Sequence, residues 1–314
     1  MLRLRAPAKL NLYLRVLGRR PDGYHDIETL FERIDLSDEL AFEPAADLAL
    51  TCSDPALSCG EDNLILKAAR LLQQGSGATQ ARPGSRNGRA GGARIHLTKR
   101  IPIAAGLGGG SSDAAAALRG LNQLWNLGLG PAQLFALGAV LGADVPFFLQ
   151  EAPFAIGRGR GEACEPLDAP PLAHILVIPA ERLSTKAVYD GWDLAAPEIR
   201  LTAQAPSITM VAHALCNGPD LSGLAEGLWN DLEPEAIRRC PVIATIQSCL
   251  RDSGCLGVRM SGSGPAVFGL CADTTQAQAV RARLPSAWRT ALIQTDACGQ
   301  MRRSRASVRQ GGGE

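Results

Sequence analysis

Apolar residues occupy every second position near the start of the chain. They are Leu10, Leu12, Leu14 and Val16, and the residues before and between them are Lys9, Asn11, Tyr13 and Arg15. Successive side chains of a strand point to opposite faces, so this alternation predicts a half-buried β-strand over residues 2–16. Lys9 and Asn11 should therefore project from the same face of that strand.

Three later segments carry apolar residues three, four or seven positions apart, which is the spacing of one helix face. The first helix is predicted over residues 62–72. The second begins after residue 113 and carries Leu118, Leu121 and Trp125, and the third opens near Pro131 and carries Leu134, Leu137 and Leu141. Short strands are predicted at residues 48–51 and 95–97.

A second half begins near Pro166, with an apolar strand at residues 175–178. Helices are predicted near residues 224–228 and 241–250, and strands at 258–260 and 266–270 flank a glycine-rich turn. This mixture of helices and strands indicates an α/β protein. A chain of 314 residues is long for a single hydrophobic core, so two domains, or one domain with a large extension, are expected.

Two segments lack the apolar residues that a packed core requires. Residues 75–92 read GSGATQARPGSRNGRAGG, and the last residues, 299–314, are rich in Arg, Gly and Ser. Such segments bury too little apolar surface to offset the entropy lost on ordering. We expect a disordered surface insertion at 75–92 and a disordered tail at 299–314.

The composition narrows the class of protein. Hydrophobic residues make up 46%, charged residues 20%, and the net charge is +1, which is typical of a globular protein that binds neither nucleic acid nor membranes. The start of the chain lacks the apolar core of a signal peptide, so a cytoplasmic protein is expected, as a monomer or weak homodimer. Nine cysteines without a C-x-x-C pair indicate free thiols rather than disulfides or a zinc site.

A glycine-rich segment with Gly106, Gly108, Gly109 and Gly110 separates a predicted strand from a predicted helix. Glycines let the backbone approach an anion closely, and the N–H groups of a helix start favour negative charge, so this segment could cradle phosphates. It is not a P-loop, which needs Lys where Ser111 stands, nor the dinucleotide fingerprint, which needs Gly there. Glycine-rich connections also occur where nothing binds, but the following Ser-Ser-Asp offers an N-cap and hydroxyls suited to phosphate and metal.

Three single residues stand out, each with a simpler alternative. Only four of the 32 basic residues are lysines, so Lys9 fits a need for a compact ammonium, and chance retention explains it equally well. Asp144 precedes Val-Pro and is either a turn former or a functional carboxylate. His25 follows a turn-like segment, where a histidine is either a ligand-binding group or an exposed bystander.

Three strings in register resemble the galactokinase, homoserine kinase, mevalonate kinase and phosphomevalonate kinase (GHMP) superfamily. They are Pro7-Ala-Lys-Leu-Asn11, residues 102–114, and Met260-Ser-Gly-Ser-Gly-Pro265. Within the superfamily, the strings APAKLNL, PDGYH, AAGLGGGSSD and GADVPF resemble the 4-diphosphocytidyl-2-C-methyl-D-erythritol kinase family. The resemblance extends from about residue 4 to about residue 295.

The resemblance implies a fold, a reaction and its cofactors. The fold is the superfamily's two-domain α/β type (an α+β two-layer arrangement), with the active site in the cleft between residues 1–165 and residues 166–298. The reaction transfers the γ-phosphoryl group of ATP, with Mg²⁺, to the 2-hydroxyl of 4-diphosphocytidyl-2-C-methyl-D-erythritol, a step of the non-mevalonate route to isoprenoid precursors.

The resemblance also implies residue roles. Asp144 matches the catalytic aspartate and Lys9 the catalytic lysine, with Asn11 beside the substrate. Tyr24 and His25 match the groups that read the cytosine, Tyr189 is a second stacking face, and Ser112 is the hydroxyl expected near Mg²⁺. The segment expected to wrap the ATP phosphates comprises Pro102, Ile103, Ala104, Ala105, Gly106, Leu107, Gly108, Gly109, Gly110, Ser111 and Ser112.

Two other functions remain open from the sequence. A kinase for mevalonate, homoserine or a sugar would keep the glycine segment without needing the Pro-Asp-Gly-Tyr-His string. A non-catalytic sensor of the same fold would bind ATP or a metabolite, and it predicts loss of Lys9 or Asp144, both of which are present.

Overall fold

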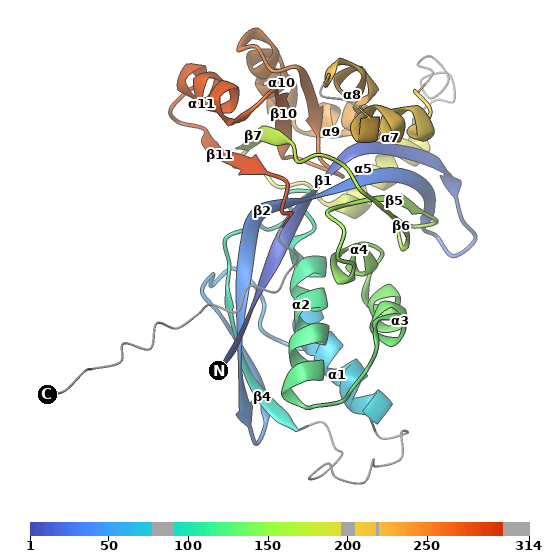
Figure 1. Ribbon diagram of the computed structural model, residues 1–314, viewed down its shortest axis with the longest axis vertical. Coiled ribbons are helices and arrows are strands. Elements are labelled where there is room, and N and C mark those ends of the chain that lie inside the picture. Colours follow the sequence, from blue (N-terminus) through green and yellow to red (C-terminus); the bar gives the residue numbers. More distant parts are fainter. Residues whose placement is uncertain (77–90, 196–204, 218–219, 298–314) are drawn as a thin grey trace, which may run out of the picture.

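Two sheets organise the computed structural model, which describes residues 1–76, 91–195, 205–217 and 220–297. The first sheet runs in the order β3-β4-β2-β1-β8, while β5 pairs with β2 and β6 with β5. Its strands are β1 (Leu2–Arg19), β2 (His25–Ala45), β3 (Leu48–Cys52), β4 (Gly92–Thr98), β5 (Phe154–Arg158), β6 (Ala163–Leu167) and β8 (Trp229–Asn230). The long strands β1 and β2 run through one half of the molecule and bend across the other (Figure 1).

The second sheet is antiparallel and runs in the order β11-β7-β10-β9. Its strands are β7 (Ala173–Ile178), β9 (Gly257–Met260), β10 (Val267–Cys271) and β11 (Arg289–Gln294). The predicted pair of strands around residues 261–265 is confirmed, because β9 and β10 pair directly across that turn. The prediction of an α/β protein is likewise confirmed.

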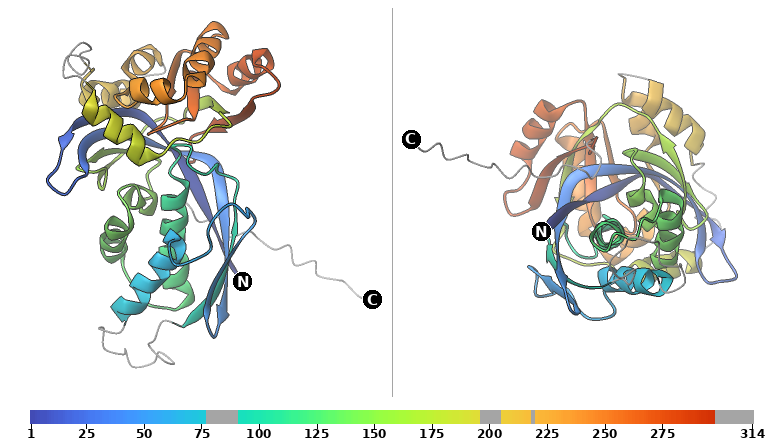
Figure 2. Two further views of the ribbon diagram at one scale, coloured as in Figure 1. Left: turned by 180° about the vertical axis from the view of Figure 1, so that it is seen from behind. Right: turned by 60° about the horizontal axis from the view of Figure 1, so that its bottom comes forward.

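Helices cover both sheets. In the first half, α2 packs against β1 and β2 on one side and against α1, α3 and α4 on the other (Figures 1 and 2). These helices are α1 (Leu64–Ser76), α2 (Gly109–Leu124), α3 (Pro131–Leu141) and α4 (Val145–Leu149). The helices of the second half are α5 (Thr185–Leu194), α7 (Ile208–Asn217), α8 (Ser222–Gly227), α9 (Glu233–Arg239), α10 (Val242–Asp252) and α11 (Thr274–Arg283).

Strand β1 is buried on both faces, contrary to the prediction of a half-buried strand. Every residue from Ala6 to Leu14 is buried, including Lys9, Asn11 and Tyr13. Ala8, Leu10 and Leu12 pack in the hydrophobic core, and glycine-rich turns cover Lys9 and Asn11, so the alternation in this part of β1 separates core from cavity rather than core from solvent.

The start of α2 corrects a second prediction. The helix begins at Gly109, with Gly108 as its N-cap in the left-handed region, so Ser111, Ser112 and Asp113 lie inside the first turns instead of before the helix. Asp113 is therefore not an N-cap.

Residues at both edges of the insertion expected at 75–92 belong to regular structure, because α1 reaches Ser76 and β4 starts at Gly92. Residues 77–90 lie outside the described residues. The expected tail at 299–314 also lies outside them.

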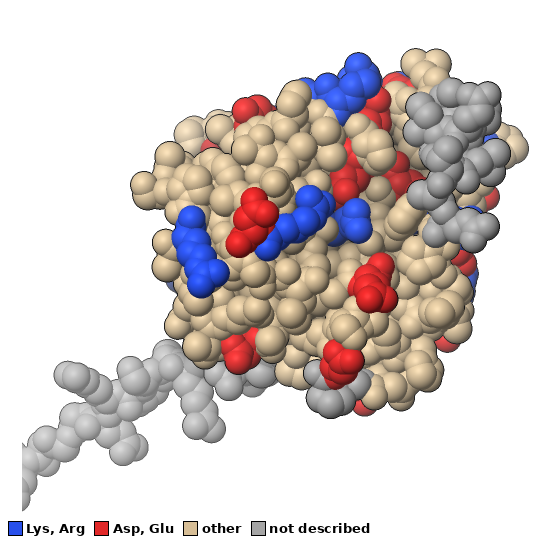
Figure 3. All heavy atoms as spheres, turned by 90° about the horizontal axis from the view of Figure 1, so that it is seen from above, with Lys and Arg blue, Asp and Glu red and all other residues tan. Residues whose placement is uncertain are grey.

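The surface carries both signs of charge. On the face seen in Figure 3, lysines and arginines alternate with acidic residues over a largely uncharged surface, in keeping with the net charge of +1. Within the described part of the chain, none of the helices has the length and apolar character needed to cross a membrane.

Candidate active site

A cavity of about 1080 Å³ lies between the two halves of the molecule. Its walls come from the glycine-rich segment, from β1 and β2, from the start of α4, from α5 and from the turn after β9. Almost every residue predicted for the site lines it: Lys9, Asn11, Tyr24, His25, Asp144, Tyr189, and the whole segment 102–111.

The glycine segment is folded tightly against β1. The backbone N–H of Lys9 donates to the carbonyl of Leu107 at 3.0 Å, and a Cβ at Gly108 would lie 2.9 Å from the Lys9 side chain. Gly108 has φ 68°, which other residues rarely adopt, and it immediately precedes α2. The first residues of α2, Gly109, Gly110 and Ser111, line the cavity, where the free N–H groups of a helix start and the helix dipole would stabilise an anion.

The second glycine-rich turn, at residues 261–265, holds the first one in place. The Ser261 hydroxyl donates to the carbonyl of Gly106 at 3.1 Å and accepts from the backbone N–H of Asn11 at 3.2 Å. A Cβ at Gly106 would lie 2.2 Å from the carbonyl oxygen of Ser261, so no side chain fits between the turns. The two sequence motifs thus form one rigid wall of the cavity.

Lys9 and Asp144 meet at the centre of the cavity. Nζ of Lys9 lies 3.7 Å from Oδ2 of Asp144 and donates to Oδ1 of Asn11, whose amide in turn donates to Thr29 at 2.7 Å. Burial lowers the pKa of Lys9, although the nearby Asp144 carboxylate acts in the opposite direction. Asp144 precedes α4 but makes no capping hydrogen bond there, and it lines the cavity.

The far end of the cavity is aromatic. The His25 ring packs against Tyr189 with centroids 4.8 Å apart and the ring planes tilted by 31°, and it meets Trp192 edge-on at 5.8 Å. Tyr24 is 57% exposed, and the guanidinium of Arg160 lies 5.0 Å from its ring centre. A planar group could stack here with one polar edge against His25.

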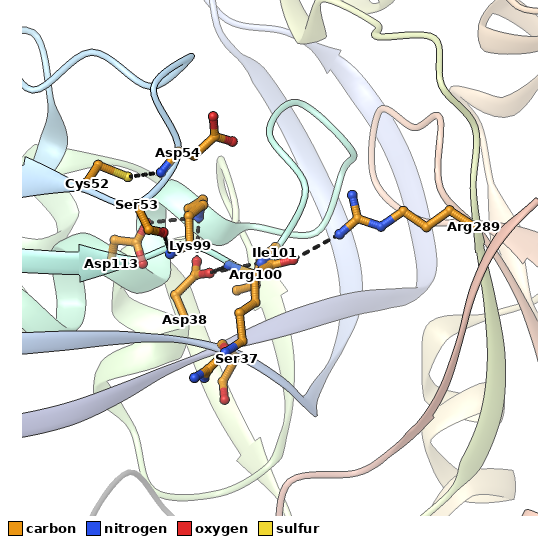
Figure 4. A network of polar contacts seen from close by, with 10 residues as sticks. All are labelled: Ser37, Asp38, Cys52, Ser53, Asp54, Lys99, Arg100, Ile101, Asp113 and Arg289. Atoms are coloured by element: carbon orange, nitrogen blue, oxygen red, sulfur yellow. Dashed lines mark hydrogen bonds and ion pairs between the residues drawn. The ribbon is translucent and has the colours of Figure 1, made fainter.

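A buried charge network joins the residues that flank the glycine segment, Arg100 and Ile101 on one side and Asp113 on the other (Figure 4). Lys99 forms ion pairs with Asp38 and, at 3.0 Å, with Asp113, while Asp38 also accepts from the backbone N–H groups of Arg100 and Ile101. The Lys99 ammonium thereby links the residues just before the glycine segment to Asp113 just after it. Burial raises the pKa of Asp113 to about 7, against the opposing effect of Lys99.

Known protein families match both halves of the chain. The GHMP kinases N terminal domain matches residues 63–151, and the GHMP kinases C terminal domain matches residues 211–290. The 4-diphosphocytidyl-2-C-methyl-D-erythritol kinase of Pelotomaculum thermopropionicum is 44% identical, over 88% of this chain and 92% of its own length. The protein of that name from Salinibacter ruber is 42% identical, over 87% and 91%.

This chain belongs to the 4-diphosphocytidyl-2-C-methyl-D-erythritol kinase family. A crystal structure of 4-(cytidine 5'-diphospho)-2C-methyl-D-erythritol kinase has a TM-score of 0.73 and 38% identity, over 93% of this chain and 98% of its own. An L. major mevalonate kinase structure has a TM-score of 0.70 at 16% identity, which shows the fold alone. The resemblance inferred from four sequence strings is confirmed.

Ser112 is the one predicted site residue that does not line the cavity. Its side chain is fully buried, and its hydroxyl has no hydrogen-bond partner among the described residues. Ser111 lines the cavity in its place. Neighbouring residues of a helix point about 100° apart, so the residue that faces the ligand depends on where the helix starts.

Several cavity residues were missed from the sequence. Lys99 and Asp113 line the cavity beneath the glycine segment, and Arg160 lines it beside Tyr24. Lys99 could have been proposed as a site residue from the sequence, because the scarcity of lysine that singled out Lys9 applies equally to Lys99. Arg160 carried none, since it is one of many arginines in the chain.

Proposed function

We propose that this protein transfers the γ-phosphoryl group of ATP to the 2-hydroxyl of 4-diphosphocytidyl-2-C-methyl-D-erythritol. The observation that carries the proposal is the position of the Lys9–Asp144 pair, between the glycine-rich wall on one side and the His25–Tyr189 stack on the other. The γ-phosphate of a nucleotide bound along the glycine-rich wall would meet, at that pair, the hydroxyl of a substrate whose cytosine lies at the aromatic end. The names of the relatives support the same substrate.

At the phosphate end, residues 102–111 and the start of α2 supply backbone N–H groups and a positive helix dipole. Lys99 adds an ammonium directly behind the loop, where a Cβ at Gly109 would lie only 3.0 Å from its Nζ. Phosphoryl transfer needs positioning and neutralisation of the phosphoryl oxygens more than covalent help from the protein. These groups provide both.

Mg²⁺ fits this site with few protein ligands. The described residues hold no group of three His, Cys, Asp or Glu side chains arranged for a metal ion. Mg²⁺ usually keeps several waters and binds through phosphates and one or two protein oxygens, and the Ser111 hydroxyl would supply one of these from the cavity wall. When bound, the ion neutralises charge on the phosphates.

At the centre, Asp144 orients the 2-hydroxyl and receives its proton as the oxygen attacks. The new bond joins that oxygen to the γ-phosphorus, the bond from the γ-phosphorus to the β,γ-bridging oxygen breaks, and ADP leaves with that electron pair. Lys9 holds the carboxylate and places a positive charge beside the reacting oxygens. Asn11 fixes the Lys9 ammonium through its hydrogen bond.

At the base end, Tyr24, His25 and Tyr189 would bind the cytosine by stacking and by hydrogen bonds to its polar edge. Thr29 links Asn11 to the Tyr13 carbonyl and so ties the catalytic strand to β2, which carries His25. The reaction centre and the base pocket are thereby held by the same pair of strands.

We also propose an ATP-binding unit over residues 1–165 and a second unit over 166–298, in a monomer or weak homodimer located in the cytoplasm. The two family matches, at 63–151 and 211–290, fall on either side of the proposed boundary. Size-exclusion chromatography with light scattering would test the oligomeric state.

The function is tested by a coupled assay for ADP release with ATP and Mg²⁺. The acceptors offered are the diphosphocytidyl compound, mevalonate, homoserine and galactose, each in a separate reaction. We expect turnover with the cytidyl compound alone. Turnover with another acceptor would identify a kinase for a different small alcohol, and ADP release with none of them, together with measurable ATP binding, would identify a sensor.

A further inference from the structure

Three residues on one side of helix α5 contact the ring of His25. Tyr189 stacks on the ring, Trp192 meets its edge, and Oδ1 of Asp193 lies 2.8 Å from Nε2. These three residues are spaced three and four positions apart, so they share one side of the helix. His25 is only 9% exposed, and Asp193 is largely buried, so this contact is part of the built site rather than a surface ion pair.

The Asp193 contact determines which ring nitrogen of His25 carries the proton. An ionised carboxylate only accepts hydrogen bonds, so Nε2 must be the protonated nitrogen that donates to it. Arg19 lies 3.5 Å from the other carboxylate oxygen and adds a positive charge beside Asp193. In the neutral ring, Nδ1 is then left with a lone pair, and it has no hydrogen-bond partner among the described residues.

An accepting Nδ1 discriminates between pyrimidine bases. Cytosine carries an amino group at C4, which donates hydrogen bonds, whereas uracil carries a carbonyl there, which only accepts. A lone pair on Nδ1 matches the amino group and opposes the carbonyl. A site built to pair with a donor rejects an analogue that lacks it, because the site's own polar group is then left unpaired.

We infer that Asp193 is a specificity-positioning residue, which selects cytidine over uridine nucleotides by holding His25 in the tautomer with its proton on Nε2. This inference rests on the proposed function in one respect, the placement of the base beside His25. Asp193 need not touch the substrate. It acts through His25, as an acidic partner fixes the tautomer of a histidine in other sites.

The first test is spectroscopic and needs no turnover. The ¹⁵N resonances of the imidazole rings are measured in the full-length protein, with the His25→Gln variant used to assign His25 among the four histidines. We expect Nε2 of His25 to be protonated and Nδ1 not, and we expect this pattern to be lost in Asp193→Ala. A proton on Nδ1 of the unaltered protein, alone or in a doubly protonated ring, would overturn the inference.

The second test measures base preference by calorimetry, with CDP and UDP as the probes. We expect Asp193→Ala and Asp193→Asn to lower the ratio of UDP to CDP dissociation constants at least about tenfold. The exposed Asp252→Asn on α10 serves as the control and should leave the ratio unchanged. A purely structural role of Asp193 would weaken both nucleotides equally, and an unchanged ratio in a folded variant overturns the inference.

The kinase assay separates this inference from the proposed function. With the cytidyl substrate, the Asp193 variants should raise KM about tenfold and leave kcat within about twofold, because the phosphate end and the Lys9–Asp144 pair are untouched. If the unaltered protein prefers CDP but fails to turn over the cytidyl substrate, the inference stands and the proposed function falls. If it turns over that substrate without any preference for cytosine, the proposed function stands and the inference falls.

Discussion

Nζ of Lys9 lies 3.7 Å from Oδ2 of Asp144, and the two side chains differ in their access to solvent, with 5% of Lys9 and 28% of Asp144 exposed. The ammonium is enclosed between β1 and the glycine turns, whereas the carboxylate opens onto the cavity. Asp144 is therefore the member of the pair that can reach a substrate hydroxyl. Lys9 is placed to hold it and to add positive charge.

Asp144→Asn should lower kcat by about 10²–10⁴-fold and leave the dissociation constant of ATP within about twofold. The amide keeps the shape of the side chain but cannot take up the proton of the hydroxyl. Steady-state kinetics and calorimetry with ATP check the two parts, and Asp252→Asn on the exposed side of α10 is the control. An equal loss of ATP affinity would contradict the assignment of Asp144 to the chemical step.

The activity should fall on the alkaline side at a pH below 10.5, the ordinary pKa of a lysine. Burial lowers the pKa of Lys9, and the positive charge is lost as the pH rises through that lowered value. This alkaline fall in activity should be absent from Lys9→Arg, whose guanidinium stays charged. The overall rate of the variant will be reduced, because Gly108 and Gly262 leave little room for the larger side chain. A pH profile of kcat/KM checks this, and an unchanged alkaline limb in the variant would assign it to another group.

Gly106→Ala should destabilise the protein and raise the KM for ATP about tenfold or more. Its φ of 79° costs a residue with a Cβ about 1–3 kcal/mol, and the added carbon would in addition lie 2.2 Å from the carbonyl oxygen of Ser261. Gly254→Ala is the matched control, since it has φ 97° but nothing within 4 Å of the added carbon. Denaturant unfolding should show a larger loss for Gly106→Ala, and equal losses would mean that contact between the turns is unimportant.

Asp38→Asn should reduce the free energy of unfolding by about 3–5 kcal/mol, because it leaves the buried Lys99 with one carboxylate fewer. The same change should raise the KM for ATP more than it lowers kcat, since Asp38 also holds the backbone of Arg100 and Ile101 at the entry of the glycine segment. Asp47→Asn, at an exposed position just after the same strand, is the control. Similar behaviour of the two variants would contradict a supporting role for the network.

No strand was predicted over residues 25–45, which form β2. It spans His25–Ala45, yet it has no clean alternation, because Glu32, Arg33 and Asp38 are buried within it. Each of them has a partner far along the chain: His174 and Thr295 for Glu32, the carbonyls of Gln150 and Glu151 for Arg33, and Lys99 for Asp38. Buried charges are tolerated only with such partners, which no local pattern reveals.

By itself, the sequence determined the chemistry that this chain could carry. The glycine segment, the Lys9 and Asp144 strings and the Tyr24-His25 turn were recognisable because their functions depend on residue type and close spacing, and helices α1 and α3 followed from local sequence signals too. The choice of family followed from these strings standing together in one order.

Tertiary structure alone decided which of these groups meet and which way they face. It brought Lys9 to Asp144, closed the turn at 261–265 over Gly106, set Asp193 against His25, and turned Ser111 rather than Ser112 to the cavity. Such relationships depend on strand register, on the residue at which a helix starts and on contacts between distant segments. Local propensity is blind to all three, because a shift of one residue moves a side chain to another face without changing the pattern.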